Sequence, residues 1–323
     1  MPRIMTFNFT VQHQFANNLA FSAAYVGNQG RHVFIGNGPD FDVNSPAWIP
    51  GVPLNQRRPF YSRYGWTNDI RLYCNCANNR YDSLQLSLEK RYSHGLTFQT
   101  NYTYQLAQGD GNSSSGTDYS FLYDRKLGYG TSGMFPFHQF IFAPTWEIPF
   151  GKGRKFGSQM HRAMDIALGG WNIDAVSTVY SGFGFDPHYD APAGYSRPDV
   201  GPNNIPSIGS GDPYAGAAHD RSQWFKGGLG GAFVLPPPNT FGNYPIMSLR
   251  GPRFYEQDMA LAKAFAVTER FRATLRAEAY NLFNHTNLGM PADNVTAGNA
   301  GQITNLAFGS TMRRMQFALR FQF

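Results

Sequence analysis

The last ten residues of the chain alternate strictly between apolar and polar side chains. Every second residue from Met315 to Phe323 is apolar, whereas the positions between them hold Arg, Gln and the small Ala318. A period of two residues predicts a β-strand with two unlike faces. Because the edge of such a strand carries unpaired backbone groups, we expect another strand to pair with it.

Eight further segments alternate in the same way. Together with the last strand they predict about nine strands of roughly ten residues, the length with which a tilted strand spans a bilayer. The apolar faces of these eight segments run through residues 5–11, 19–25, 84–88, 98–104, 140–148, 171–179, 259–265 and 271–279.

The connections between these segments are sorted by length. Barrels of the outer membrane have short periplasmic turns and long extracellular loops, so this sorting favours an antiparallel transmembrane β-barrel over a soluble sandwich. Short connections lie near residues 16–18, 93–95 and 266–269, a middling one covers 151–167, and long ones cover 36–80, 107–135, 183–252 and 284–311.

Composition agrees with an all-β membrane protein. Aromatic residues make up 16% of the 323 residues, charged residues only 15%, and the mean hydropathy is −0.39. The absence of a long apolar run excludes transmembrane helices, whereas barrel strands expose only alternate residues to lipid. The net charge of +6 is scattered, with one dense group at Lys152, Arg154 and Lys155, so no nucleic acid is expected as a partner.

Strand parity and inward charges indicate a portion of a larger barrel. Single-chain bacterial barrels have even strand numbers, and an open sheet would leave costly unpaired backbone groups in lipid. The N-terminus shows no secretory signal, so we expect further strands upstream of Met1. Arg270, Arg272, Arg276 and Glu278 share the polar face of one strand, which requires a wide, wet lumen or a polar plug.

The sequence contains no pattern that assigns a catalytic, cofactor-binding or metal-binding residue. The eight histidines lack metal-ligand spacing, and no nucleophile motif of the G-x-S-x-G type occurs. Asp110, Asn112 and Asp118 miss the spacing of a calcium-binding loop. Cys74 and Cys76 are one residue apart, where a disulfide is strained and rare, so two loop cysteines are expected.

Ligand contacts are expected from the long loops and the upper lumen. Tyr214, Trp224 and Phe225 in the longest loop could stack on a sugar or an aromatic ligand. They could equally pack the loop on itself, which is the favoured interpretation. Lys90 and Lys263 lie on strands near an interface and are expected to extend their ammonium groups toward water.

Several ordered segments resemble the C-terminal barrel portion of TonB-dependent outer-membrane receptors, in particular the Oar-like branch. The resemblance covers nearly the whole chain, and RAEAYNLFNHTN and the stretch from LRGP to the following KAF are its most specific parts. The segments are LAFSAAYVGNQGRHV (19–33), YDSLQLSLEKRYSHGLTFQTNYTYQ (81–105), FIFAPTWEIPFGKGRKF (140–156), LGGWNIDAVSTVYSGFGFDP (168–187), TFGNYPIMSLRGPRFYEQDMALAKAF (240–265), ERFRATLRAEAYNLFNHTNLGMP (269–291) and the terminal FALRFQF.

The resemblance implies a barrel of about 22 strands with a plugged lumen, and TonB-coupled passage of a ligand across the outer membrane. Residues 1–323 would form the C-terminal part of that barrel, with the plug domain, the TonB-contacting region and the N-terminal strands absent. The last strand looks like the C-terminal signal of such barrels, which the barrel-assembly machinery would read at Phe317, Leu319, Phe321 and Phe323. Outer-membrane lipid, that machinery and TonB are the implied partners, the cell outer membrane is the implied location, and no enzyme activity is expected.

The residues alone leave two other functions open. A small stand-alone barrel could act as an outer-membrane pore or adhesin, which needs an extra strand or assembly from several chains. A soluble β-rich carbohydrate-binding protein would need its outward aromatic side chains buried against a second sheet.

Overall fold

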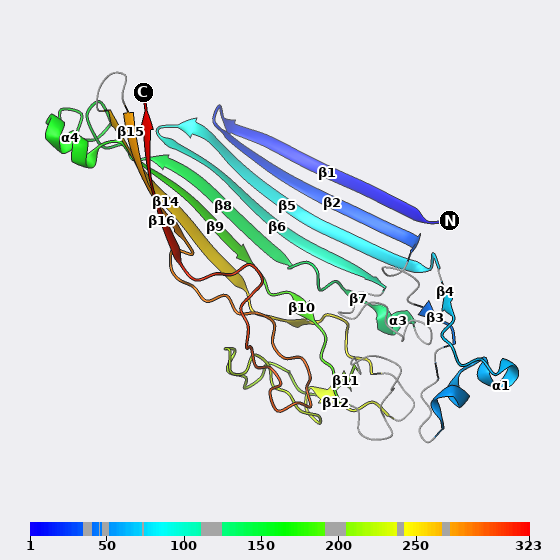
Figure 1. Cartoon of the computed structure of the whole chain (residues 1–323). Coiled ribbons are helices and arrows are strands. Elements are labelled where there is room, and N and C mark those ends of the chain that lie inside the picture. Colours follow the sequence, from blue (N-terminus) through cyan, green and yellow to red (C-terminus); the bar gives the residue numbers. More distant parts are fainter. Residues whose placement is uncertain are drawn as a thin grey trace.

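The long strands form one antiparallel sheet in which each pairs with the next long strand along the chain (Figure 1). A computed structural model describes residues 1–34, 41–44, 46, 52–72, 74–110, 125–190, 205–237, 242–266 and 272–323. The sheet contains β1 (Arg3–Ala16), β2 (Leu19–Val33), β5 (Ala77–Ser93), β6 (Leu96–Asp110), β8 (His138–Glu147), β9 (Trp171–Tyr180), β14 (Phe254–Ala266), β15 (Arg272–Tyr280) and β16 (Arg314–Gln322), in that order, and the short β7 (Tyr129–Thr131) adds to β6.

The predicted strands and the sorting of their connections are confirmed. Each predicted apolar segment overlaps one long strand, and the short connections 17–18 and 94–95 lie at the same end of the sheet as the middling connection 148–170. The predicted short connection 266–269 lies, apart from its first residue, outside the described residues. The long connections leave from the other end. Their described parts carry short elements: β3 (Phe41–Asp42), η1 (Leu54–Arg57), α1 (Tyr61–Tyr64), β4 (Arg71–Leu72), α3 (Arg125–Gly128), β10 (Gly184–Phe185), β11 (Ser207–Ile208), β12 (Phe233–Val234) and β13 (Leu249–Arg250). One short helix, α4 (Arg162–Leu168), lies in the connection 148–170.

The strand registers bring the apolar alternates of all strands onto one face. Directly opposed residues share a face of an antiparallel sheet, so a chain of register partners can be followed from edge to edge. One such row crosses six strands through Val11, Ala23, Leu86, Tyr102, Phe140 and Val179. The adjacent row on the other face runs through Gln12, Ser22, Ser87, Asn101, Ile141, Thr178 and Glu256.

A glycine on the apolar face fits under an aromatic ring of the neighbouring strand. Gly27 on β2 is the register partner of Phe7 on β1. A Cβ atom at Gly27 would lie 2.2 Å from the Phe7 ring, so a larger residue there would displace the ring. The ring thus covers the backbone where no side chain is available, and this contact favours the observed register.

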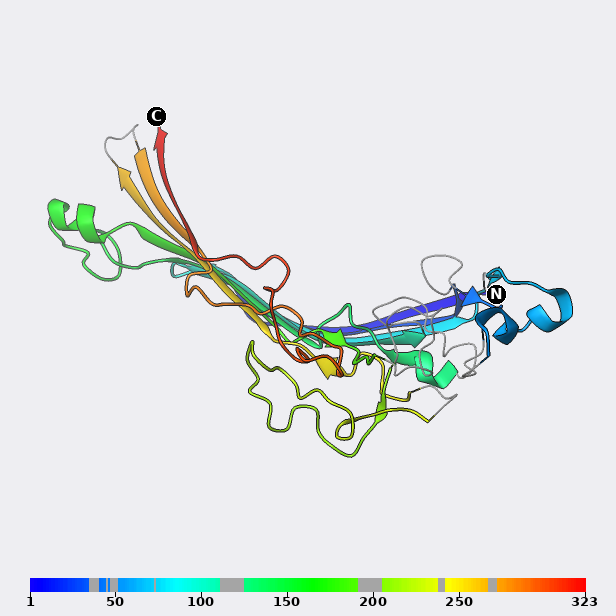
Figure 2. The ribbon, with the colours of Figure 1, turned by 60° about the horizontal axis from the view of Figure 1, so that its bottom comes forward.

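The buried hydrophobic core lies mainly in the long connections and not between strands. We call the described parts of residues 181–253 and 281–313 the cap, which lies at the long-loop end of the sheet (Figures 1 and 2). Its two connections share backbone hydrogen bonds, such as His188 N to Asp293 O at 3.0 Å and Trp224 N to Gly301 O at 2.7 Å. Its core consists of Phe185, Tyr189, Phe225, Ala232, Phe233, Tyr244, Leu249 and Val295.

The sheet is not closed in the described part of the chain. β1 has β2 as its one neighbour and β16 has β15, so the two form opposite edges of the sheet. The total of about 22 strands stays a prediction. Within the described residues, the helices are all too short or too polar to cross a membrane.

Replacing Leu86 by Arg is expected to destabilise the folded sheet in a membrane by about 2–4 kcal/mol, because its side chain lies on the apolar face near the middle of β5. Gln85→Arg, on the polar face of the same strand, is the matched control and should change stability by about 0.5 kcal/mol or less. Urea unfolding in lipid vesicles measures both changes. Equal losses would contradict the assignment of the two faces.

Candidate functional site

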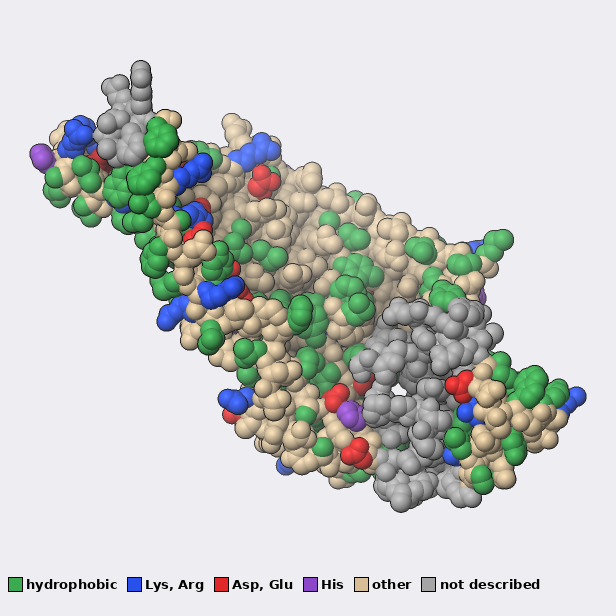
Figure 3. All heavy atoms as spheres, in the orientation of Figure 1, with side chains coloured by type: hydrophobic (Ala, Val, Ile, Leu, Met, Phe, Trp, Pro, Cys, Tyr) green, Lys and Arg blue, Asp and Glu red, His purple; other side chains and the backbone are tan. Residues whose placement is uncertain are grey.

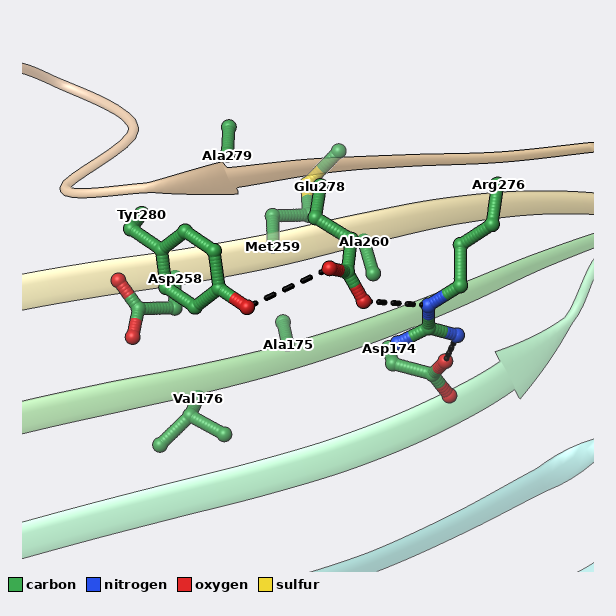
Figure 4. Close-up of a pocket in the computed structure, with 10 residues that line it drawn as sticks. All are labelled: Asp174, Ala175, Val176, Asp258, Met259, Ala260, Arg276, Glu278, Ala279 and Tyr280. Carbon is green, nitrogen blue, oxygen red and sulfur yellow. Dashed lines mark hydrogen bonds and ion pairs between the residues drawn. The ribbon is translucent and has the colours of Figure 1, made fainter. Parts of the chain in front are cut away.

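The polar face carries an ion-pair network where β9, β14 and β15 lie side by side (Figure 4). Arg276 on β15 donates from Nε to Glu278 Oε1 at 2.6 Å and from Nη1 to Asp174 Oδ2 at 2.7 Å. Asp174 lies on β9, two strands away from Arg276. Ala260 and Ala262 on the intervening β14 are the register neighbours of these charges, and their short side chains leave room for the guanidinium to reach across.

Neutral side chains hold the two carboxylates of this network in place. Thr145 Oγ1 donates to Asp174 Oδ1 at 2.9 Å, and Asn172 Nδ2 donates to the same oxygen at 3.2 Å. The Tyr280 hydroxyl donates to Glu278 Oε2 at 3.3 Å. Each carboxylate therefore accepts hydrogen bonds from neutral groups as well as from the arginine. These hydrogen bonds fix the position of the carboxylate on the polar face of the sheet.

A cavity of about 180 Å³ lies against the network and is lined by Asp174, Asp258, Arg276, Glu278 and Tyr280 (Figure 4). This volume holds on the order of six water molecules and is below the roughly 300 Å³ at which drug-sized ligand pockets begin. The cavity combines three carboxylates with one guanidinium and holds no nucleophile paired with a base. The cavity therefore suits a polar or cationic group that approaches the polar face of the sheet.

The structure brings two of the four predicted lumen charges together. Arg276 and Glu278 join the network, whereas Arg272 is exposed on the same face near the other end of β15, opposite Gln322. Arg270 lies outside the described residues. We did not predict from the sequence that Asp174 belongs to this ion-pair network, although the alternation along its strand already placed Asp174 on the polar face.

Charged side chains concentrate on the half of the sheet that ends with β16. Figure 3 shows Lys, Arg, Asp and Glu side chains gathered over β14, β15 and β16, while uncharged groups dominate the neighbouring strands. Arg276, Arg314 and Arg320 belong to this half of the polar face, which also carries the acidic Glu256, Asp258 and Glu278. The polar face is therefore mixed in charge and does not form a track of one sign.

The segment before β8 folds onto the polar face at the long-loop end. Gln105 on β6 donates from Nε2 to Pro136 O at 3.0 Å and accepts at Oε1 from the Tyr81 hydroxyl at 3.0 Å. The cap packs against the same segment, since a Cβ at Gly130 would lie 2.4 Å from Ile246. The cap is thus tied to the polar side of the sheet.

Two of the predicted loop aromatics hold one arginine of the cap. Trp224 Nε1 donates to Arg250 O at 2.7 Å, and the Tyr214 hydroxyl donates to the same oxygen at 3.1 Å. The Arg250 guanidinium lies 3.5 Å from the centre of the Phe137 ring, a cation–π contact. Burial lowers the pKa of Arg250 and raises the pKa of Tyr214, so both groups belong to the interior of the cap.

A larger cavity, of about 650 Å³, lies between the strand ends and the cap. Its size falls within the range of ligand pockets. Phe225 is 0% exposed and packs in the cap core, so it cannot stack on a ligand, and the interpretation that it packs the loop on itself fits the structure. Trp224 is the predicted aromatic that lines this cavity, together with His138, Tyr180, His219, Arg253 and His285.

Nearly the whole chain matches one protein family. A family model described as outer membrane beta barrel domain matches residues 1–316. The chain belongs to this family. The protein is therefore an outer-membrane protein, whose apolar face contacts lipid and whose polar face lines the interior.

The fold is also similar to solved outer-membrane structures. The outer membrane transporter YddB from Escherichia coli matches with 9% identity and a TM-score of 0.50, over 99% of this chain and 32% of that chain. The pyoverdine outer membrane receptor FpvA from Pseudomonas aeruginosa PAO1 matches with 10% identity and a TM-score of 0.46, over 100% of this chain and 30% of that chain. This chain thus spans about a third of the length of either structure, and no curated protein matches it.

The last strand of this outer-membrane sheet presents its apolar side chains to lipid. Phe317, Leu319, Phe321 and Phe323 are between 51% and 97% exposed. Phe317, Leu319 and Phe321 are register partners of Ala277, Leu275 and Ala273 on the apolar face of β15. Their recognition by an assembly machinery stays a prediction.

The structure corrects the expectation for the two cysteines. Cys74 and Cys76 form a disulfide directly before β5, with their Cα atoms 5.2 Å apart. Asn112 and Asp118, weighed above as calcium ligands, lie outside the described residues. In the rest of the chain that the structure describes, no three His, Cys, Asp or Glu side chains are grouped as metal ligands would be.

Asp174→Asn and Arg276→Met are expected to be coupled by about 1–2 kcal/mol in a double-mutant cycle, because each removes the same ion pair. With 38% and 30% of the two side chains exposed, solvent screening keeps the coupling at this modest level. Urea unfolding in vesicles measures the cycle. In the control cycle, Arg272→Met, an exposed change on the same face, replaces Arg276→Met and should show no coupling with Asp174→Asn. Strictly additive losses of stability for Asp174→Asn and Arg276→Met would contradict the network.

The cap should unfold between pH 10 and pH 12. Burial raises the pKa of Tyr189 and of Tyr244 to about 12, whereas tyrosines of an unfolded chain ionise near pH 10. Their contribution to stability is therefore complete below about pH 10 and is lost as the pH rises toward 12. Tyr244→Phe should keep the cap folded to higher pH, as followed by tyrosinate absorbance, while Tyr64→Phe on the exposed α1 should not. Loss of the cap at the same pH in both variants would refute this cause.

Proposed function

We propose that this chain forms part of the wall and the extracellular cap of a TonB-dependent outer-membrane receptor of the Oar-like branch. In this proposal a barrel of about 22 strands surrounds a plug, and the energy of the inner membrane, passed on through TonB, drives a ligand across the outer membrane. The remaining strands, the plug and the TonB-contacting region would belong to parts of the protein beyond residues 1–323.

The polar wall around Asp174, Arg276 and Glu278 carries the proposal. A narrow barrel fills its interior with its own side chains, whereas this wall keeps hydrogen-bonded charges beside a small wet cavity. Such a wall needs water or a polar partner in front of it, because an unpaired charge in an apolar interior is costly. A polar plug inside a wide barrel supplies that partner.

The cap favours the function of a receptor and argues against that of an open pore. It has its own hydrophobic core and is tied to the polar side of the sheet through Gln105 and Arg250. A ligand that arrives from outside meets the cap and the cavity of about 650 Å³ lined by Trp224, His219 and His285. Selection of the ligand is therefore expected at this cavity, and the charged wall below it is expected to hold the plug.

The two alternatives fare differently. A soluble carbohydrate-binding protein would need its outward aromatics covered, whereas Phe9 and Phe317 are 69% and 70% exposed on the apolar face, in a chain of an outer-membrane family. A stand-alone pore shares the location and the polar wall with a receptor. It differs in having no plug, which a current measurement detects.

The full-length protein, purified from outer membranes and placed in a planar bilayer in KCl, is expected to pass no steady current, because the plug closes the lumen. Current should begin once urea loosens the plug. Arg276→Met should lower the urea concentration at which current begins, since the wall loses its bridging guanidinium. Lys226→Met, an exposed change in the cap, is the matched control.

Steady current without urea would contradict the plugged receptor and support the pore. TonB coupling has its own test, which is calorimetric titration of the full-length protein with the purified periplasmic domain of TonB. Saturable binding supports the coupling, and an absence of binding refutes it.

A further inference from the structure

The connection between β8 and β9 exposes apolar and basic side chains together. We call residues 148–170, which contain α4, the periplasmic turn, because short connections of outer-membrane barrels lie on that side. Figure 3 shows green and blue side chains side by side at this end of the molecule. Its large exposed apolar residues are Phe150, Phe156, Met164, Ile166 and Leu168, and its exposed basic residues are Lys152, Arg154, Lys155 and Arg162.

Two residues of the lipid-facing side hold α4 at the membrane side of the sheet. Trp171 and Lys263 are register partners and lie on the apolar face, in one row with Leu275 and Leu319. Lys263 Nζ donates to the carbonyl oxygens of Ala167, at 3.1 Å, and of Gly169, and Trp171 Nε1 donates to Ala167 O at 3.2 Å. Lys263 is only 3% exposed, so its ammonium group binds the end of α4 and does not extend toward water, which corrects the expectation for this residue.

The basic side chains of the periplasmic turn keep most of their charge available. Asp165 is engaged within the turn, where its carboxylate accepts from Lys152 N at 2.6 Å, and Glu147 pairs with Arg154 at 3.1 Å. The side chains of Lys152, Lys155 and Arg162 form no ion pair with the described part of the chain, and Lys155 Nζ lies 5.5 Å from the centre of the exposed Phe156 ring. Three cations therefore project from a segment that also exposes five large apolar side chains.

We propose that the periplasmic turn is a membrane anchor that binds the headgroups of anionic phospholipids in the periplasmic leaflet. The apolar side chains Phe156, Met164, Ile166 and Leu168 lie among the upper acyl chains, and Lys152, Lys155 and Arg162 contact the phosphates. Amphipathic segments with basic polar faces bind interfaces through this combination of burial and charge. The apolar face of β9 and β14 continues directly into the segment, so the lipid already in contact with the sheet is its nearest partner.

This inference rests on the outer-membrane location and not on transport. An exposed apolar patch of this kind could in principle face a periplasmic protein. The lipid is favoured because Trp171 and Lys263, two residues of the apolar face, hold α4 through hydrogen bonds. In addition, three cations without an ion pair in the described part of the chain complement an anionic surface. If the full-length protein did not bind TonB, or if its lumen proved to be open, the proposed membrane anchor would still stand.

The test places a bimane label at Ile166→Cys in the full-length protein, with Cys74 and Cys76 replaced by Ser. The protein is reconstituted into vesicles of phosphatidylcholine with 30% phosphatidylglycerol, and bromine quencher is carried on the acyl chains of either lipid in turn. Quenching is compared per mole of brominated lipid, because phosphatidylglycerol is the minor component. We expect quenching by both lipids and at least twofold stronger quenching by the brominated phosphatidylglycerol. A second label at Met164→Cys repeats the measurement should the first variant fold poorly.

The charge variant Lys152→Gln/Lys155→Gln/Arg162→Gln should abolish the excess quenching by phosphatidylglycerol and retain insertion. The matched control Arg63→Gln/Arg221→Gln/Lys226→Gln removes three exposed cations from the long-loop side and should keep the excess. A label that neither lipid quenches would overturn the anchor and leave the patch to a periplasmic protein. Equal quenching by the two lipids in the unaltered turn would overturn the recognition of anionic headgroups.

Discussion

Backbone pairing between adjacent strands decides on which side of the sheet every side chain lies. A slip of one residue in any pair would move a whole strand's apolar residues from lipid to water, so each register is constrained by both of its neighbours. The row from Val11 to Val179 crosses six strands without a break in this order. The ion pair from Arg276 to Asp174 depends on the same constraint, because it joins strands that meet only through β14.

A sheet with lipid on one face and a wet interior on the other cannot bury its own side chains. This explains why the hydrophobic core around Phe225, Phe233 and Val295 lies in the cap. The strands are stabilised by hydrogen bonds within the sheet and by lipid, whereas the cap is stabilised as a small water-soluble domain is. The two parts therefore respond to different conditions: charge in lipid affects the first, and ionisation of buried tyrosines affects the second.

The sequence predicts the strands well, because the two solvents of a barrel impose a period of two on every strand. Loop lengths then set the order and direction of the strands without knowledge of any contact. The pairing of Arg276 with Asp174 could not be predicted in the same way, since it requires the register across β14 and the small Ala260 and Ala262. The cap and the Cys74–Cys76 disulfide could not be predicted either, because they lie in irregular backbone, which leaves no periodic pattern in the sequence.

The cap joins two connections that are far apart in the sequence, and this has a consequence for the order of assembly. His188 bonds to Asp293 and to Val295, so the first connection finds its partner only after more than 100 further residues, including β14 and β15, have been made and placed. Contacts of such long range form late in folding. The outer surface of the protein is therefore expected to mature last, after the neighbouring hairpins have formed, and until then its apolar residues need protection from aggregation.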